Sequence, residues 1–465
     1  MHHSPLWLSL LTALTLSASL TAQKQKSEPV TEERVQAAYR DAQAACEKVL
    51  GVKLDELPPL TLVDSDAVAR AITAENLPSV RHREPDETKA IAEAERLGLQ
   101  HAPMVYAKYS WSPTKSFLVV AKTWELNARV LKRPGLTGDH ALRAVMVHEL
   151  CHAIDDRKFD FEKRLLEAET ADAITAISAV IEGHAQLVAR RVCFTSGWSD
   201  GFDTFTDSIG AVPENMLDGE ASKFLIRATA AANAMTYIDG ERFVTEVLKA
   251  RPDTGSKDLF MSPPKETETI QQPQWYLEPK TRPELLYDVE PALDGFVASF
   301  DPAVWSSTRN TVTGKQIASG LSMLPKAEVD AFVRTLRSAR LVQLTPTAAP
   351  QAKAAILIAI EFDTEDAARN WIAISERVSD QKDETMDKGI LRITDSKTTV
   401  LEHPPLNGIM QEKQMKNGRL EFDVTTIDAH KGRLVIETIY SGDPPKAEDH
   451  VKLVATLLDA ITKRS

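Results

Sequence analysis

One short stretch, VMVHELCHAIDD from Val145 to Asp156, constrains this chain more than any other segment. His148 and His152 lie four residues apart, and on an α-helix such residues share one face, one turn apart. Glu149 stands between them, and most of the other positions are apolar. A helix that is apolar around one narrow polar patch is a buried helix that carries a site.

Two imidazoles at this spacing can bind one metal ion. For zinc, each Zn–N distance would be about 2.0–2.1 Å. Glu149 is rotated away from the ligands but can still reach a metal-bound water, as a general base does in metal-assisted hydrolysis. Upstream, Thr137 and Asp139 are both suitable N-caps for this helix. Two core histidines with ordinary hydrogen-bond partners are the alternative that the motif leaves open.

A catalytic zinc site needs a third protein ligand and one open position. Glu182 is the best candidate, because it lies in the apolar run SAVIEGHAQLV, where a carboxylate is costly unless it is paired or bound to a metal. Gly183 beside it allows another backbone or a substrate to come close. His184 is the alternative ligand, but it lies about 200° round the helix from Glu182, so both cannot bind the same ion.

The composition is that of a soluble globular protein. The chain has 465 residues, of which 43% are hydrophobic and 26% charged, enough for two or three domains with sizeable cores. Its net charge of −12 argues against nucleic acid or an anionic membrane as a partner of the bulk surface. The sequence does not indicate an oligomeric state.

The chain has three cysteines, Cys46, Cys151 and Cys193, which cannot all pair within one chain and do not suggest a disulfide scaffold. We expect Cys151 to be a small buried side chain, with a role as a zinc ligand as the alternative. We expect Cys46 and Cys193 to be either buried or paired.

Residues 1–22 are predicted to form a signal peptide that is removed after Ala22. The run PLWLSLLTALTLSASLTA is apolar, is short for a membrane span and ends in small residues, and the polar stretch QKQKSEP follows at once. No Lys or Arg precedes it, and a retained anchor is the alternative. No later stretch is apolar enough to span a bilayer, so we expect an exported, periplasmic or extracellular protein without stable membrane insertion.

The pattern of helices and strands predicts an α+β protein with two domains. Residues 23–340 are predicted to form a mainly helical domain, with a β-hairpin of MVYAKYS and SFLVVAK ahead of the histidine helix. The Pro/Ala-rich segment 341–352 predicts a linker. Residues 353–465 predict a smaller C-terminal α+β domain with helices on a mostly antiparallel sheet.

The order HELCHAIDD, then EGHA, resembles the His-Glu-x-x-His helix and the downstream Glu-Gly-x-Ala helix of gluzincin-type zinc metallopeptidases. The longer pattern resembles that of a group of poorly characterised secreted bacterial and archaeal proteins of this type. In that group a Y-x-x-G-x-x-F-V helix and a PP-x-x-T-x-x-I-x-x-P-x-x-Y loop follow, which here are YIDGERFV (Tyr237 to Val244) and PPKETETIQQPQWY (Pro263 to Tyr276). The resemblance covers roughly residues 30–290. Cys151, Asp155 and Gln272 stand where Thr, Gln and His are common, which removes neither a proposed ligand nor the base.

The resemblance implies a zincin-like fold, in which a small twisted sheet lies beside the active helix with its edge strand along the substrate cleft. It implies one zinc ion per chain, held by His148, His152 and Glu182. The implied activity is hydrolysis of peptide bonds in a peptide or protein substrate, with Glu149 as the general base. Tyr237 is the candidate oxyanion stabiliser, and a helix-packing tyrosine is the alternative.

Asp156 lies at i+4 from His152 and could hold that imidazole in place, or it could be a helix-end carboxylate in solvent. The alternative function is that of a non-catalytic, zinc-containing extracytoplasmic binding or scaffold protein. Glu149 argues against this alternative, because a purely structural zinc site needs no base and usually has four protein ligands.

Overall fold

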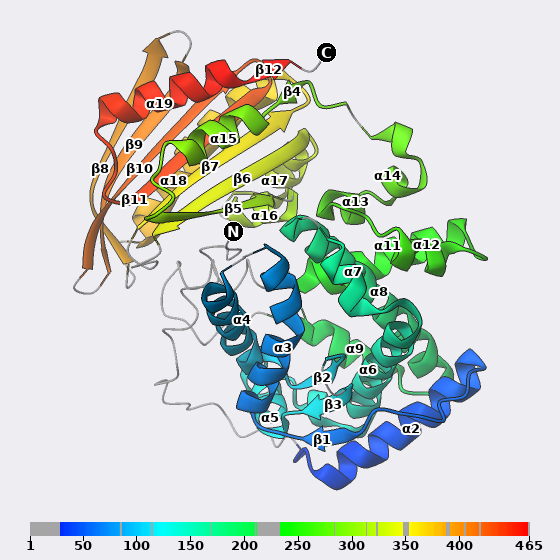
Figure 1. Cartoon of the computed structure of the whole chain (residues 1–465). Coiled ribbons are helices and arrows are strands. Elements are labelled where there is room, and N and C mark those ends of the chain that lie inside the picture. The colour runs from blue at the N-terminus through cyan, green and yellow to red at the C-terminus, as the bar shows by residue number, and fades with distance from the viewer. Residues whose placement is uncertain are drawn as a thin grey trace. The chain divides into compact units, whose positions relative to one another are not determined.

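The computed structural model describes most of the chain between residues 28 and 463, shown as a ribbon in Figure 1. The positions it does not describe are 1–27, 84–85, 113–114, 169, 210, 212–232, 283, 313, 322–323, 347–352, 387–390, 404–405, 418–419 and 464–465. The predicted signal peptide therefore lies outside the described residues. Within them the chain divides into two units, a helical unit up to Pro279 and a sheet unit from Lys280 onward.

The predicted domain boundary near residue 340 is wrong. Strand β6 (Leu336–Pro346) runs through the first part of the predicted linker and pairs with β7 (Ala354–Phe362). Both strands belong to one seven-stranded sheet, so residues 280–340 belong with the C-terminal strands rather than with the histidine helix. Pro346, the first proline of the segment that resembles a linker, is the last residue of β6, a position at which a strand tolerates proline.

The helical unit contains a small sheet and many helices. Its elements are α2 (Glu32–Leu50), β1 (Leu60–Leu62), α3 (Ser65–Arg83), α4 (Glu87–His101), β2 (Ala107–Ser110), β3 (Ser116–Val119), α5 (Ala121–Val130), α6 (Asp139–Phe159), α7 (Phe161–Leu166), α8 (Ala171–Ser196), α9 (Ser199–Ile209), the π-helix η4 (Met235–Asp239), α11 (Gly240–Ala250), α12 (Gly255–Met261), α13 (Thr267–Gln271) and α14 (Pro273–Leu277). Short 3-10 helices occupy Ala102–Met104, Pro134–Thr137 and Pro279–Thr281.

Helix α6 carries the two histidines and lies in the core of the helical unit. Every residue from Ala144 to Ala153 is buried, as the apolar sequence on all sides of the polar patch predicts. The predicted N-cap is wrong: Gly138 holds that position without a side-chain hydrogen bond. Thr137 instead donates its hydroxyl hydrogen bond to Pro134 O, and Asp139 is the first helical residue.

The long helical pattern after α6 is divided into α7 and α8. Asp160 ends α6 with a left-handed φ of 58°, and its side chain accepts from Lys163 N to begin α7. Thr170 then caps α8 by accepting from Ala173 N, and Gly197 ends α8 in the left-handed region. These caps place α8 across α6 as a separate helix, so that side chains from the two helices can meet.

The three strands of the helical unit form a sheet in the order β1-β3-β2. β2 and β3 form the predicted antiparallel hairpin, and β1 pairs with β3 in parallel. β2 is one of the two edge strands, and its Tyr109 packs in the same core as α6. The sheet therefore presents an edge, rather than a central strand, to the histidine helix.

The sheet unit is built on seven antiparallel strands in the order β5-β6-β7-β11-β10-β9-β8. Its remaining strands and its helices are β4 (Tyr287–Asp288), α15 (Glu290–Ala298), β5 (Trp305–Thr311), α16 (Gly314–Gly320), α17 (Lys326–Val333), α18 (Glu365–Met386), β8 (Leu391–His403), β9 (Leu406–Asn417), β10 (Leu420–Lys431), β11 (Leu434–Gly442), α19 (Ala447–Ala460) and β12 (Thr462–Lys463).

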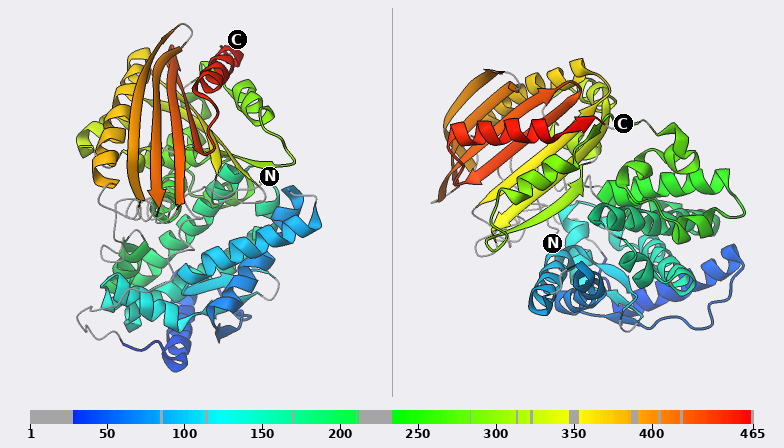
Figure 2. Two further views of the ribbon diagram at one scale, coloured as in Figure 1. Left: turned by 90° about the vertical axis from the view of Figure 1, so that its left-hand side faces the viewer. Right: turned by 45° about the horizontal axis from the view of Figure 1, so that its top comes forward.

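Helices cover both faces of the seven-stranded sheet (Figures 1 and 2). α15 and α19 pack on one face, and α16, α17 and α18 pack on the other. Successive residues of β11 show this, because Leu434 and Ile436 join the first core and Val435 joins the second. The chain as a whole is therefore an α+β protein, and its sheet unit has three layers.

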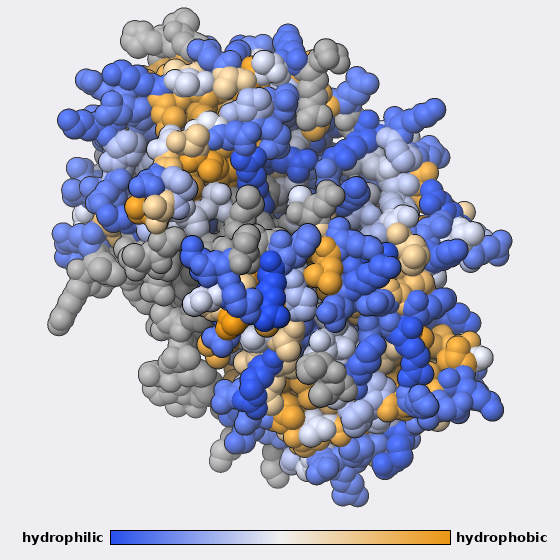
Figure 3. Space-filling model, viewed as in Figure 1, coloured by the Kyte–Doolittle hydropathy of each residue, from blue (hydrophilic) through white to orange (hydrophobic). Residues whose placement is uncertain are grey.

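No helix among the described residues is both long and apolar enough to cross a membrane. Hydrophilic residues predominate on the face shown in Figure 3, which agrees with the net charge of −12.

Asp428 of β10 is an acid buried in the sheet unit. Its Oδ2 accepts a hydrogen bond of 2.7 Å from Ser375 Oγ of α18. Burial raises the pKa of Asp428 from 3.8 to about 6. A raised pKa means that the folded state binds the proton more tightly than the unfolded state. The stability that this carboxyl provides is therefore present at low pH and is lost as the pH rises from about 4 to about 6.

At pH 7 the substitution Asp428→Asn is expected to raise the free energy of unfolding by up to about 3 kcal/mol, given a shift of about two pKa units. The gain should disappear below about pH 4, where the wild-type carboxyl is protonated in both states. Urea unfolding at the two pH values measures both effects. Asp423→Asn changes an exposed acid of the same strand; it should stay within about 0.5 kcal/mol of wild type. An Asp428→Asn protein less stable than wild type at pH 7 would contradict this prediction.

Candidate metal centre

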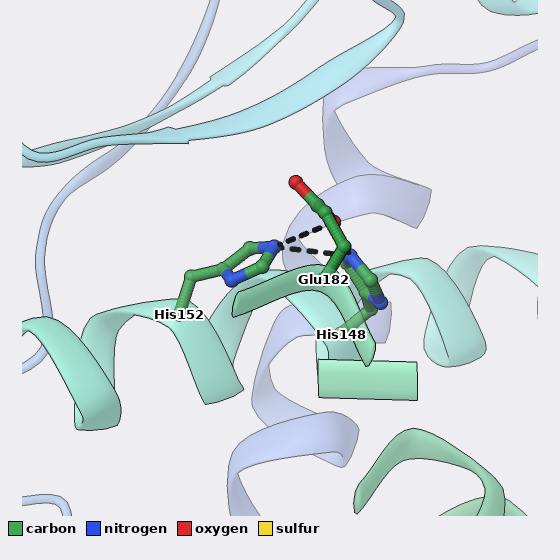
Figure 4. A group of neighbouring side chains, drawn as sticks. All are labelled: His148, His152 and Glu182. Carbon is green, nitrogen blue, oxygen red and sulfur yellow. Dashed lines mark hydrogen bonds and ion pairs between the residues drawn. The ribbon is translucent and has the colours of Figure 1, made fainter. Parts of the chain in front are cut away.

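His148, His152 and Glu182 converge between α6 and α8 (Figure 4). His148 Nε2 lies 3.0 Å from His152 Nε2 and 2.9 Å from Glu182 Oε2. His152 Nε2 lies 3.3 Å from the same carboxylate oxygen. The other oxygen of Glu182 points away from the two rings (Figure 4). The two histidines of α6 and Glu182 of α8 thus bring three donor atoms together. We call this group of His148, His152 and Glu182 the triangle.

Gln186 determines the tautomer of His148. Its Oε1, one turn after Glu182 on α8, lies 3.1 Å from His148 Nδ1, while its Nε2 faces Thr206 Oγ1 at 3.5 Å. A carbonyl oxygen can only accept, so His148 Nδ1 carries the proton and Nε2 presents a lone pair to the triangle. Metal-binding histidines are commonly held in this way through their second nitrogen.

The charges of the triangle are coupled. Burial acts to raise the pKa of Glu182, but the two imidazoles outweigh it and hold that pKa well below its usual range. Burial acts to lower the pKa of His152, but the Glu182 carboxylate outweighs it and raises that pKa. Glu182 is therefore ionised, and the triangle attracts positive charge, whether a proton or a metal ion.

The triangle has the size and the donor atoms of a zinc site. Ligands at about 2.0–2.1 Å from a tetrahedral zinc ion lie about 3.3 Å from one another. The three distances of 2.9, 3.0 and 3.3 Å equal this value or fall slightly below it. Among the described residues the group offers three ligands. A tetrahedral ion bound there would keep one position open, which is the arrangement of catalytic sites.

Glu149 is held by the edge of the small sheet. Its Oε2 accepts a hydrogen bond of 2.6 Å from the main-chain N–H of Tyr109 on β2. Only 8% of Glu149 is exposed, and its charge acts on both His152 and Tyr237. Within the described part of the chain, its second oxygen has no protein hydrogen bond. The Glu149 carboxylate is therefore oriented by the backbone of β2. It lies beside the triangle but is not one of its three members.

Tyr237 lies against the same triangle. It belongs to the π-helix η4, and its ring stacks on the His148 ring with 5.7 Å between the centroids. Burial, and then the charge of Glu182, raise the pKa of Tyr237 well above its usual value. The hydroxyl therefore keeps its proton at neutral pH and remains a donor.

Gly183 explains how closely α8 approaches the start of α11, which directly follows η4. A Cβ atom on Gly183 would lie 2.2 Å from the backbone carbon of Gly240, and one on Gly240 would lie 2.2 Å from Ala179 O. The sequence left open whether a backbone or a substrate approaches Gly183, and in the structure it is a backbone. Any side chain here would push η4 and Tyr237 away from the triangle.

Asp156 does not hold His152 in place, contrary to the sequence-based interpretation. Its Oδ2 accepts from the Tyr109 hydroxyl at 2.9 Å and from Lys115 Nζ at 3.0 Å, and its Oδ1 accepts from Phe161 N. Asp156 is also buried rather than solvent-exposed. The buried Nδ1 of His152 has no hydrogen-bond partner within the described residues.

His184, the alternative third ligand, lies away from the triangle, as its position round α8 predicts. Its Nδ1 lies 2.5 Å from Asp155 Oδ2 and 3.7 Å from Cys151 Sγ.

The three cysteines are free thiols. Cys151 is buried, as expected, and so are Cys46 and Cys193. Burial, and then the charge of Asp155, raise the pKa of Cys151 well above its usual value, which makes it a poor nucleophile.

Two contributors to the site, Gln186 and Tyr109, were not predicted from the sequence. Gln186 could have been found, because it lies at i+4 from Glu182 and so on the same helical face. Tyr109 could not, because the donor is a main-chain N–H that any residue would supply. Only the pairing of β2 with β3 turns that N–H toward α6.

No protein-family model matches this chain, and no curated protein matches it. A function for this chain therefore has to be inferred from the residues of the site.

Proposed function

We propose that this protein is an exported zinc-dependent peptidase of the gluzincin type. The observation that carries the proposal is the meeting of His148, His152 and Glu182, with the backbone-oriented Glu149 beside them. The apolar leader sequence over residues 1–22 supports export. The likeness of the HELCH and EGHA motifs to gluzincins supports the reaction class.

The roles of the residues follow from their positions. His148, His152 and Glu182 would hold the zinc ion, with Gln186 fixing the first imidazole. When bound, zinc would polarise the scissile carbonyl and make a water molecule more acidic. Glu149 would take a proton from that water and pass it to the leaving amine.

Tyr237 is the donor best placed for the oxyanion. Its ring stacks on the His148 ring, and its hydroxyl keeps its proton because burial and the Glu182 charge both raise its pKa. A protonated hydroxyl can stabilise negative charge that develops on the carbonyl oxygen in the transition state.

The edge strand β2 supports a peptide as the substrate. An extended peptide can add to an exposed strand edge through main-chain hydrogen bonds, without recognition of its side chains. Because Tyr109 N–H on this edge donates to Glu149, a peptide paired with β2 would pass beside the base. This arrangement is the one expected of a zincin-like peptidase.

A metal analysis combined with the digestion of a peptide library tests the proposal. The purified protein should contain zinc and cleave members of the library, as read by mass spectrometry. Removal of zinc by a chelator should abolish cleavage, and added zinc should restore it. A folded, zinc-loaded protein that cleaves no peptide would contradict the proposal and favour a binding or scaffold protein.

A further inference from the structure

Cys151, Asp155 and His184 form a second group of metal-ligating side chains beside the triangle. Cys151 and Asp155 lie at i and i+4 on α6, on the face next to His148 and His152, and His184 comes from α8. Their donor atoms all lie within 4.8 Å of one another. We propose that these three residues bind a thiophilic divalent cation such as zinc, which joins α6 to α8 and raises the metal content from one ion per chain to two.

The distances to the sulfur are those of a metal site. A tetrahedral zinc ion with a Zn–S bond of about 2.3 Å places the sulfur about 3.5 Å from its nitrogen and oxygen ligands. Cys151 Sγ lies 3.5 Å from Asp155 Oδ2 and 3.7 Å from His184 Nδ1. The nitrogen and oxygen lie 2.5 Å apart, as a hydrogen-bonded pair does, and would separate by about 0.8 Å around the ion.

The burial of these groups favours a bound cation. Cys151 is 2% exposed and Asp155 4%, and the His184 side chain is 13% exposed. Phe260 covers His184 edge-on, with 5.4 Å between the ring centroids. A buried carboxylate requires a compensating positive charge. A divalent ion would neutralise the Asp155 carboxylate, and its binding would release the proton of the Cys151 thiol, so that all three side chains could act as ligands.

The two groups differ in the chemistry that they offer. Two neutral imidazoles and one carboxylate would leave a divalent ion with an excess of one positive charge, which suits the activation of water. A thiolate, a carboxylate and one imidazole would leave the ion neutral, and thiolate ligands select soft cations such as zinc. The second ion would therefore be a poor activator of water even with its fourth position left to a water molecule, and its role would be to fix α8 against α6 so that Glu182 meets His148 and His152.

Cobalt substitution of the full-length protein tests the second site directly. A cobalt(II) ion bound to a thiolate gives a sulfur-to-metal charge-transfer absorption in the near ultraviolet, and a site of two histidines and a glutamate does not. Titration of metal-free protein with cobalt(II) should reach two ions per chain and produce this absorption. One ion per chain without the absorption would overturn the proposal, and the Asp155–His184 pair would then be an ordinary buried ion pair.

Variants assign the absorption to its residues. Cys151→Ala and His184→Asn should each lower the cobalt content to one ion and lose or shift the absorption. Cys46→Ala and Cys193→Ala change the other two buried thiols and should keep it. Glu182→Gln should lose the other ion and keep the absorption, which separates this proposal from the catalytic one. If Cys46→Ala or Cys193→Ala removes the absorption and Cys151→Ala retains it, the assignment is wrong. The wild-type titration decides the question even if a variant fails to fold.

Discussion

Replacement of Glu149 by glutamine is expected to lower kcat for peptide hydrolysis by about 10²–10⁴-fold, the usual contribution of a general base. Glutamine has nearly the same shape and can still accept the hydrogen bond from Tyr109 N–H. It cannot take a proton from water. Zinc content should be unchanged, because Glu149 is not one of the three residues that form the triangle.

The measurement is the rate of cleavage of a peptide selected from the library, with zinc determined on the same samples. Asp139→Asn is a matched control, since Asp139 is an acid on the same helix whose side chain is 59% exposed and pairs with Arg34. It should cleave at the wild-type rate. Equal rates for wild type and Glu149→Gln would exclude Glu149 as the base.

Replacement of Glu182 by alanine is expected to abolish both cleavage and stoichiometric zinc binding at the triangle. The substitution leaves two neutral imidazoles, which lack the negative charge that balances the ion and supply one ligand fewer than a catalytic zinc site has. Because 23% of the Glu182 side chain is exposed, its loss should leave the fold of the helical unit intact. Competition with a zinc-binding dye measures the affinity, and circular dichroism measures the fold.

Asp172→Asn provides the control for Glu182→Ala. Asp172 is a second buried acid of α8, but it accepts hydrogen bonds from Thr267 and lies far along the helix from the triangle. The affinity for zinc should remain that of wild type. If Glu182→Ala retains zinc at wild-type affinity at the triangle, Glu182 is not a ligand.

The local elements of the helical unit could be predicted from the sequence because their signals are local. The i, i+4 spacing of His148 and His152 places both on one face of any α-helix, and the apolar residues around them predict burial. The position of Glu182 in an apolar run, about 200° round its helix from His184, separates the two candidate ligands before any packing is known. In the structure the two side chains lie in different groups.

The domain boundary could not be predicted in this way. Composition near residue 345 resembles a linker, but β6 continues through Leu341–Pro346 because its partners β5 and β7 supply the hydrogen bonds. Pairing between strands far apart in the chain is a tertiary property, and a local pattern does not contain it.

Helical periodicity depends only on spacing along the chain, so the candidate ligands could be selected before any packing was known. Which of these side chains meet depends on how the helices and strands pack. The contact of Gly183 with Gly240 brings Tyr237 to the triangle, and the edge of β2 turns Tyr109 N–H toward Glu149. The same crossing of α6 and α8 places His184 against Cys151 and Asp155. Such contacts could not be predicted from local patterns, because they depend on the close packing of whole helices and strands, which residues distant in the sequence establish together.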